Sequence, residues 1–269
     1  MQKKRSNRRK EGCGDGPFQI EMRNEMNNKY ELTAETKSAF GYTLHRVCAL
    51  RDIPRFNIRA GDSGGWIAGV HNLSQDDDAW VSGDAEVCGN AQVFGDSKVF
   101  GSALVSGDAR VYGDARAYGD ADVCGNANVC GDTRVYGSAE VSGNATVCGD
   151  AEVFGNASVS GSAWVSGNAL VSGAAEVCGD AEVCGSARVC GDAEVCGKED
   201  YMVLKNSWSS GRWFTYTRSN KMWKVGCFYG NGESLVAKAY RDSELSGKCY
   251  EEIVRAVEAI YKAIEESKG

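Results

Sequence analysis

The twelve residues from Asp120 to Gly131 read Asp-Ala-Asp-Val-Cys-Gly-Asn-Ala-Asn-Val-Cys-Gly, which is one six-residue unit written twice. The unit is usually Asp, Asn or Ser, then Ala, a variable residue, Val, a second variable residue and Gly, and it repeats from Asp78 to Gly197. Gly closes all 20 units, Val keeps its position in 19 of them and Ala in 18. Self-similarity at a fixed period indicates a repeat architecture.

The chemistry of the unit predicts a short strand followed by a corner. Within Ala-x-Val-x the small apolar side chains alternate with variable ones, so Ala and Val face one side of a strand. Gly tolerates positive φ, and the Asp or Asn after it bonds the local backbone, which is turn chemistry. A helix is excluded because Gly at every sixth position would cost about 1 kcal/mol each time. The strands therefore wind into a solenoid whose neighbouring coils share one core.

The pattern is similar to the hexapeptide repeat of left-handed β-helices, in which three units make one triangular coil. The resemblance implies that residues 18 apart stack, and that 20 units make roughly six and two-thirds coils. On one side, the column after Val would then hold Ser82, Phe100, Tyr118, Tyr136, Phe154, Ser172 and Cys190. The column before Val on that side would hold Trp80, Lys98, Arg116, Arg134, Glu152, Leu170 and Arg188. We expect a mainly β protein: a left-handed-type parallel β-helix with an N-terminal β cap and a small C-terminal α+β module.

The chain divides into four parts. Residues 1–29 form an arm whose first ten residues include six basic side chains and no acid. Such an arm is normally disordered, although it also suits contact with nucleic acid or an anionic surface. Residues 30–77 are expected to form strands that cap the solenoid, with Trp66 closing the core, because open strand edges would otherwise pair with other chains. Residues 78–197 are the repeat, and residues 198–269 are the module.

The C-terminal module has a different composition. Alternating stretches at 212–218 and 222–228 predict strands, and a later apolar stripe predicts one amphipathic helix. That stripe consists of Tyr250, Ile253, Val254, Val257, Ile260, Tyr261 and Ile264. From Lys198 to Arg241 there are eight basic and three acidic residues. The mixture suits a cationic face over an aromatic core, or alternatively a nucleic-acid or partner contact. The candidates for that contact are Arg212, Trp213, Tyr216, Arg218, Trp223 and Lys224.

The segment before the repeat carries a family resemblance. With Leu44-His45-Arg46-Val47, then Arg59-Ala60-Gly61-Asp62-Ser63-Gly64-Gly65-Trp66-Ile67 and then the hexads, residues 30–197 resemble uncharacterised bacterial and phage hexapeptide-repeat proteins. These are often labelled acetyltransferases, and acyltransferases of that fold use a His general base beside a loop that breaks the coils. Here His45 and His71 both precede the repeat, and no loop interrupts it. We therefore expect no enzymatic activity, with acyl transfer as a weaker alternative.

The strongest site candidate is an aromatic ladder flanked by cations. It consists of Phe100, Tyr118, Tyr136 and Phe154 with Lys98, Arg116 and Arg134. Stacked aromatics are rarely left bare on a surface, and cations add attraction to ring systems. We expect this phage-type scaffold protein to contact a second copy of itself or a host macromolecule there. Alternatives are nucleic-acid association through the arm and module, or inhibition of a host protein through the acidic face. On that face the column before Val holds Glu86, Leu104, Asp122, Glu140, Ser158, Glu176 and Glu194. A second ladder, Asp96, Asp114, Asp132 and Asp150, suits bonds to turn amides better than a string of calcium ions.

Cysteine spacing and hydropathy argue against several other classes of protein. Eight of the 12 cysteines occupy a variable position of the repeat, and C-x-x-C spacing is absent, so neither a zinc site nor a disulfide framework is expected. The basic start does not lead into an apolar stretch, as a secretory signal would. No apolar run approaches the ~20 residues that span a bilayer. We expect a cytoplasmic protein with reduced repeat cysteines, no metal and no cofactor.

Overall fold

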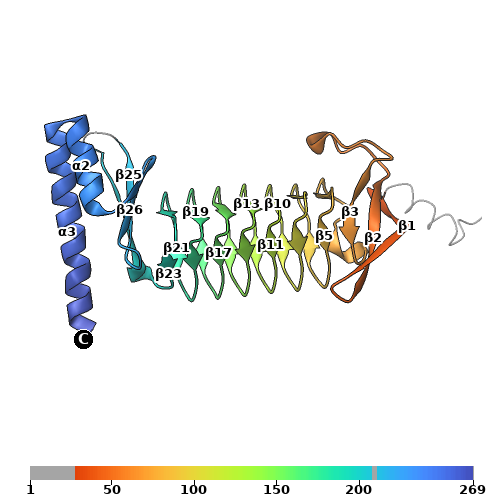
Figure 1. Ribbon diagram of the computed structural model, residues 1–269. Helices are drawn as coiled ribbons and strands as arrows, with labels where there is room; N and C mark the ends of the chain where they lie inside the picture. The colour runs from red at the N-terminus through yellow and green to blue at the C-terminus, as the bar shows by residue number, and fades with distance from the viewer. Residues whose placement is uncertain (1–27, 208–210, 269) are drawn as a thin grey trace, which may run out of the picture.

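The computed structural model describes residues 28–207 and 211–268, so all but the last two residues of the predicted arm lie outside the description. Three parallel sheets form the sides of an elongated solenoid, and other structure lies at both ends (Figure 1). Paired strands are 18 residues apart in the sequence, as Asp122 is from Glu140 and Tyr118 from Tyr136. The prediction of a parallel β-solenoid with three units per coil is confirmed.

Each side of the solenoid is one sheet. The acidic face consists of β3 (Ser63–Ile67), β5 (Glu86–Val87), β8 (Leu104–Val105), β11 (Asp122–Val123), β14 (Glu140–Val141), β17 (Ser158–Val159), β20 (Glu176–Val177) and β23 (Glu194–Val195). The aromatic face consists of β4 (Trp80–Val81), β7 (Lys98–Val99), β10 (Arg116–Gly119), β13 (Arg134–Gly137), β16 (Glu152–Gly155), β19 (Leu170–Gly173) and β22 (Arg188–Val189). The third face consists of β6 (Gln92–Val93), β9 (Arg110–Val111), β12 (Asn128–Val129), β15 (Thr146–Val147), β18 (Trp164–Val165) and β21 (Glu182–Val183).

The interior is filled by the two invariant columns of the repeat. The inward Ala and Val side chains are at most 1 % exposed, and each buried Val contributes roughly 1.5–3 kcal/mol. The two polar residues in the Ala column are also buried, and their hydroxyl groups are satisfied. Ser97 donates to the carbonyl of Phe94 at 2.9 Å, and Thr133 donates to that of Cys130 at 2.6 Å. The core therefore tolerates a hydroxyl only where a corner carbonyl accepts its proton.

Outside the strand ladders, the hydrogen bonds between coils all point the same way along the solenoid. The N–H of Asp122 donates to the carbonyl of Ala139 at 3.0 Å, and the N–H of Glu140 donates to that of Ala157 at 2.9 Å. The first coil is consequently left mainly with unpaired C=O groups, and the last coil mainly with unpaired N–H groups. Buried backbone groups of either kind need partners. The solenoid thus requires hydrogen-bond donors at its N-terminal end and acceptors at its C-terminal end.

The N-terminal cap supplies donors. It consists of β1 (Tyr30–Ala39), β2 (Tyr42–Ala49), and the 3-10 helices η1 (Pro54–Phe56) and η2 (Val70–Asn72). Strands β1 and β2 form an antiparallel hairpin, and β2 pairs with β3, so the hairpin extends the acidic face. The N–H of Trp66 donates to the carbonyl of Ala85 at 2.9 Å, and the Asn72 side-chain amide donates to that of Ala91 at 2.8 Å. The first-coil carbonyl groups are thereby paired.

Ile67 is the residue of β3 that faces the core, and the expectation that Trp66 closes the core is wrong. Ile67 pairs with Val87 and is fully buried in the solenoid core. Side chains alternate along a strand, so Trp66, the residue before Ile67, lies on the outer side. Its ring centroid is 4.5 Å from the Lys37 ammonium and 5.0 Å from the Arg46 guanidinium. Trp66 therefore fastens the hairpin to the outside of the solenoid.

Lys29, at the end of the predicted arm, is fully buried in the cap. Its ammonium donates to the carbonyl of Ala79 at 2.6 Å and to the carboxylate of Asp77 at 3.5 Å. Burial lowers the pKa of Lys29 from its usual 10.5 to about 8, although Asp77 acts in the opposite direction. The cap thus contains an ionisable donor at the carbonyl end of the solenoid.

We expect the Lys29 contribution to the free energy of unfolding to rise with pH between about 8 and 10.5, by at most about 3 kcal/mol. In this window the unfolded chain binds a proton at Lys29 that the folded protein has released, which favours folding as pH increases. Above about pH 10 stability should fall, because burial raises the pKa of tyrosines such as Tyr216 to about 12. Denaturant titrations across this range measure both slopes. Lys29→Met should lose the rise and keep the fall, and an unchanged rise would contradict the assignment to Lys29.

The C-terminal module supplies acceptors. It consists of η3 (Lys198–Asp200), the antiparallel sheet β24 (Tyr201–Lys205), β25 (Trp213–Thr217), β26 (Met222–Val225) and β27 (Phe228–Gly230), and the helices α2 (Gly232–Asp242) and α3 (Glu244–Lys268). The carboxylate of Asp200 accepts from the N–H groups of Cys196 and Gly197 at 2.9 and 2.8 Å. The hydroxyl of Thr215 accepts from the N–H of Arg188 at 3.0 Å. The exposed amides of the last coil are thereby paired.

Helix α3 has two apolar stripes where the sequence predicted one. Tyr250, Val254, Val257 and Tyr261 are buried against the sheet and α2, whereas Ile260 is 46 % exposed. The prediction that Ile260 belongs to the buried stripe is wrong. A step of three residues stops short of a full helix turn, so Ile260 lies to one side of the stripe that packs on the sheet. The α+β character of the module is confirmed, with α2 as an additional helix. No helix in the described ranges is long and apolar enough to cross a membrane.

Candidate functional site

Four aromatic rings form a continuous stack on the aromatic face, as the 18-residue spacing predicts. The ring centroids of Phe100, Tyr118, Tyr136 and Phe154 are 4.7, 4.9 and 4.9 Å apart, and adjacent rings lie within 7° of parallel. Strand pairing holds Tyr118 opposite Tyr136, which sets this spacing. Each ring covers the face of the next, so the stack presents mainly ring edges and phenol groups to solvent. A partner would contact edges and hydroxyls more than open ring faces.

The three cations of the predicted site lie in the adjacent column but differ in their surroundings. The Lys98 ammonium lies 5.4 Å from the ring centroid of Phe100, and burial together with the nearby Arg116 lowers its pKa. Arg134 pairs with Glu152 at 3.1 Å. Arg116 is exposed and forms no ion pair with any residue in the two described ranges. The aromatic strip, defined as these three cations and the four rings, therefore has one cation available to a partner.

A groove of about 280 Å³ lies beside the aromatic strip. Its lining consists of Arg55, Asp114, Arg116, Asp132, Arg134, Asp150 and Glu152. Arg55, from the N-terminal cap, donates to Asp96 at 3.2 Å and pairs with Asp114. The expectation that Asp96 bonds a turn amide is thus corrected, because a cap guanidinium takes that place. The groove has an alternating set of carboxylates and guanidinium groups, which suits a partner with both signs of charge.

The six candidates in the C-terminal module do not form one surface. Tyr216 and Trp223 are 3 % and 0 % exposed in the module core, so these two rings cannot stack on bases and that interpretation is wrong for them. Trp213 is 38 % exposed, and its ring centroid lies 5.4 Å from the Lys205 ammonium. Arg218 pairs with Asp200 of η3 and with Glu265 of α3. The basic side chains that retain some exposure are Arg212, Arg218 and Lys224.

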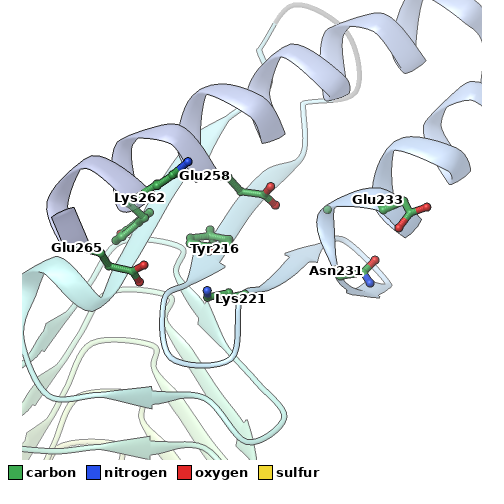
Figure 2. Close-up of a pocket in the computed structure, with 9 residues that line it drawn as sticks. Tyr216, Lys221, Asn231, Glu233, Glu258, Lys262 and Glu265 are labelled. Carbon is green, nitrogen blue, oxygen red and sulfur yellow. The ribbon is translucent and has the colours of Figure 1, made fainter.

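A cleft of about 510 Å³ lies between α3, the sheet and the start of α2. Figure 2 shows Glu258, Lys262 and Glu265 on α3 above the strand that carries Tyr216. The lining consists of Tyr216, Lys221, Asn231, Gly232, Glu233, Glu258, Tyr261, Lys262 and Glu265. Glu258 also accepts a hydrogen bond from the indole N–H of Trp223 at 3.3 Å, so it contacts the module core as well as lining the cleft. The sequence did not indicate this cleft, because its position depends on α2.

The phenols of this cleft stay protonated at neutral pH. Burial raises the pKa of Tyr216 to about 12, with Glu258 as the next cause, and burial raises that of Tyr261 to about 12 as well. A phenol of that pKa donates hydrogen bonds but is a poor general base near pH 7. The cleft geometry is therefore suited to polar binding rather than to proton abstraction.

One cluster within the described residues has the spacing of metal ligands. The ligand atoms of Cys178, Glu194 and Cys196 lie within 4.8 Å of one another. The two sulfur atoms, however, lie at disulfide-bonding distance on consecutive coils, with a Cα–Cα distance of 4.5 Å. A disulfide removes both thiolates, so the cluster does not offer a zinc site. The expectation that every repeat cysteine stays a thiol is corrected at this pair, because stacking brings columns of cysteine within bonding range.

Both histidines belong to the N-terminal cap. His71 Nε2 lies 2.9 Å from the carbonyl oxygen of Gly89, on the first coil. His45 lies on β2, opposite Thr36 on one side and Ile67 on the other. Strands β4 to β23 follow at six-residue intervals, so the coils run on without the loop that would place a substrate beside a histidine. The arrangement favours a structural role for both imidazoles.

No protein-family model matches the chain, and no curated protein matches it. The resemblance to hexapeptide-repeat proteins therefore rests on the repeat and the segment before it. A repeat of this kind specifies a fold, and one fold supports many functions. Function has to be argued from the geometry of the aromatic strip and its neighbouring groove.

Proposed function

We propose that the protein is a non-enzymatic, rigid scaffold that binds a partner macromolecule through the aromatic strip. The observation that carries this proposal is the stack of four partly exposed rings held in register by strand pairing. Side chains that are already ordered lose little conformational entropy on binding, which favours affinity. The resemblance to phage proteins directs attention to a protein of the host cell as the partner.

The charges beside the strip favour a polypeptide over a nucleic acid. Asp132 and Asp150 line the groove next to Arg116 and Arg134, so phosphate groups would meet carboxylates as well as guanidinium groups. The rings offer edges, whereas bases need open ring faces for stacking. A polypeptide can supply apolar side chains for the ring edges and both signs of charge for the groove. The non-enzymatic role and a cytoplasmic location remain parts of this proposal.

Removing two central rings is expected to weaken partner binding while leaving the solenoid folded. Tyr118→Ala with Tyr136→Ala should reduce retention of a host protein by roughly tenfold or more, because truncating a central aromatic anchor typically costs over 1 kcal/mol. The matched control is Ser142→Ala with Ser160→Ala, which changes the equivalent positions of the acidic face. Tagged variants are incubated with host extract, and the retained proteins are quantified by mass spectrometry. Circular dichroism verifies that both variants keep the strand signal.

Two outcomes would count against the proposal. Equal retention of the same protein by the ring variant and the control would remove the aromatic strip as the binding surface. Retention of RNA or DNA that weakens steeply with salt, equally in both variants, would support the nucleic-acid alternative through the arm and module.

A further inference from the structure

The outermost of the described helices, α3, presents an apolar stripe to solvent. Figure 1 shows α3 at the end of the molecule, on the far side of the C-terminal sheet from the solenoid. One side of α3 packs on the sheet and α2 through its buried stripe. A second set of residues, named here the outer stripe, consists of Leu245, Cys249, Ile253, Ala256, Ile260 and Ala263. Leu245 is 73 % exposed, Ala256 and Ala263 are exposed, and only Cys249 and Ile253 are half-buried.

The spacing of the outer stripe is that of a helix–helix seam. From Cys249 it advances by four, three, four and three residues, which is the heptad pattern that keeps one seam facing a second helix. The larger Ile side chains alternate with Ala, so a partner helix can approach closely at the Ala positions. A helix that packs on one side only needs a single apolar stripe. The second stripe therefore indicates a second helix, along a seam of up to about 37 Å for 25 residues.

We propose that α3 packs in antiparallel orientation against α3 of a second copy of this chain, giving a dimer joined at its C-terminal ends. The charges beside the outer stripe support this occupant. Lys248 and Glu252 lie near the start of the helix, and Lys262 and Glu266 lie near its end. Antiparallel packing places Lys248 opposite Glu266 of the other copy and Glu252 opposite Lys262, whereas parallel packing would oppose like charges.

The surface of α3 also has a receiving site for such a partner. A shallow depression of about 330 Å³ is bordered by Lys248, Cys249, Glu252 and Ile253. In the antiparallel register that pairs these charges, Ala263 of the second copy lies over this depression, and the symmetric contact forms at the other end. The dimer leaves the aromatic strip of each solenoid free, so this inference is independent of the proposed function.

The mass of the full chain in solution tests the dimer. Sedimentation equilibrium of the unaltered protein at micromolar concentration should give twice the 28.8 kDa chain mass. Ala256→Glu with Ile260→Glu should give a single-chain mass, because four carboxylates would meet across the seam. The matched control, Ser234→Glu with Ala237→Glu on the exposed side of α2, should remain a dimer. All these positions are exposed, so circular dichroism should show unchanged helix content.

A single-chain mass for the unaltered protein would overturn the proposal, and so would dissociation of the control to the same extent. Orientation is tested separately with Ala263→Cys under mild oxidation by oxidised glutathione, because position 263 lies within two residues of the position opposite Cys249. Peptide mapping should find Cys249 of one copy joined to the introduced thiol of the other. A link between the two Cys249 residues instead would show parallel packing and would refute the antiparallel arrangement. The mass and cross-linking results do not depend on whether the aromatic-strip variant, Tyr118→Ala with Tyr136→Ala, loses partner binding.

Discussion

A chain reduced to residues 78–197 should assemble into unbranched filaments, whereas the full chain should not. Outside the strand ladders, every hydrogen bond between coils runs from an N–H to the carbonyl of the following coil, so the bare solenoid has an end rich in carbonyl groups and an end rich in amides. The two ends of different molecules are complementary, and head-to-tail contacts that do not close produce open fibres. Each junction would form hydrogen bonds and bury apolar Val and Ala surface like that between any two coils of one molecule.

The polarity of the ends gives this prediction its controls. A chain of residues 28–197 keeps the donor cap and exposes mainly N–H groups, which do not pair with their own kind. A chain of residues 78–268 keeps the acceptor cap, with Asp200 and Thr215, and exposes mainly carbonyl groups at its other end. Neither should form filaments, but mixing the two should give a one-to-one complex. The 78–268 chain carries Ala256→Glu and Ile260→Glu to prevent association through α3.

Electron microscopy and sedimentation distinguish these outcomes. Filaments with a strand repeat of about 4.8 Å along the axis are expected only for the uncapped chain. Filaments formed by either single-capped chain would show that the caps do not act by pairing the end groups. An uncapped chain that folds, as judged by its strand signal, yet stays monomeric would contradict the role of hydrogen-bond polarity.

The solenoid was predictable from the sequence because one short unit encodes it twenty times. Each unit contains the inward pair, the outward pair and the corner, so an error in any one unit cannot change the assignment. The period also fixes which outer residues stack, and the stacking of Tyr118 on Tyr136 follows directly from their separation of 18. Repetition of a short pattern therefore predicts both the fold and the pairs of outer residues that stack.

The caps and the module were less predictable because each occurs once. Ile67 rather than Trp66 faces inward, and this depends on the register with β5, which no local pattern shows. The burial of Tyr216 and Trp223 depends on α2 and α3 folding back over the sheet. A mixture of aromatic and basic residues looks the same in sequence whether the rings are outside or inside. Only the packing of distant elements decides that difference.

Replacing Gly125 by Ala should destabilise the protein much more than replacing Gly185 by Ala. Both glycines have positive φ, +69° and +67°, so an L side chain at either costs about 1–2 kcal/mol. A Cβ at Gly125 would also lie 2.9 Å from the backbone N and O of Gly143 on the next coil. A Cβ at Gly185, on the last coil of the third face, meets no atom within 4 Å. The crowded position should therefore cost a further 1–3 kcal/mol or so.

Asn substitutions separate the two contributions to this cost. Asn adopts positive φ more readily than Ala, so Gly185→Asn should be milder than Gly185→Ala. At Gly125, Asn should recover only a small part of the unfolding free energy that Ala loses, because the Asn Cβ meets the same backbone atoms of Gly143. Free energies of unfolding from denaturant titrations of the four variants give both differences. Equal losses for Ala at the two glycines would mean that the coils separate freely, and the close stacking of corners would then contribute little to the rigidity of the solenoid.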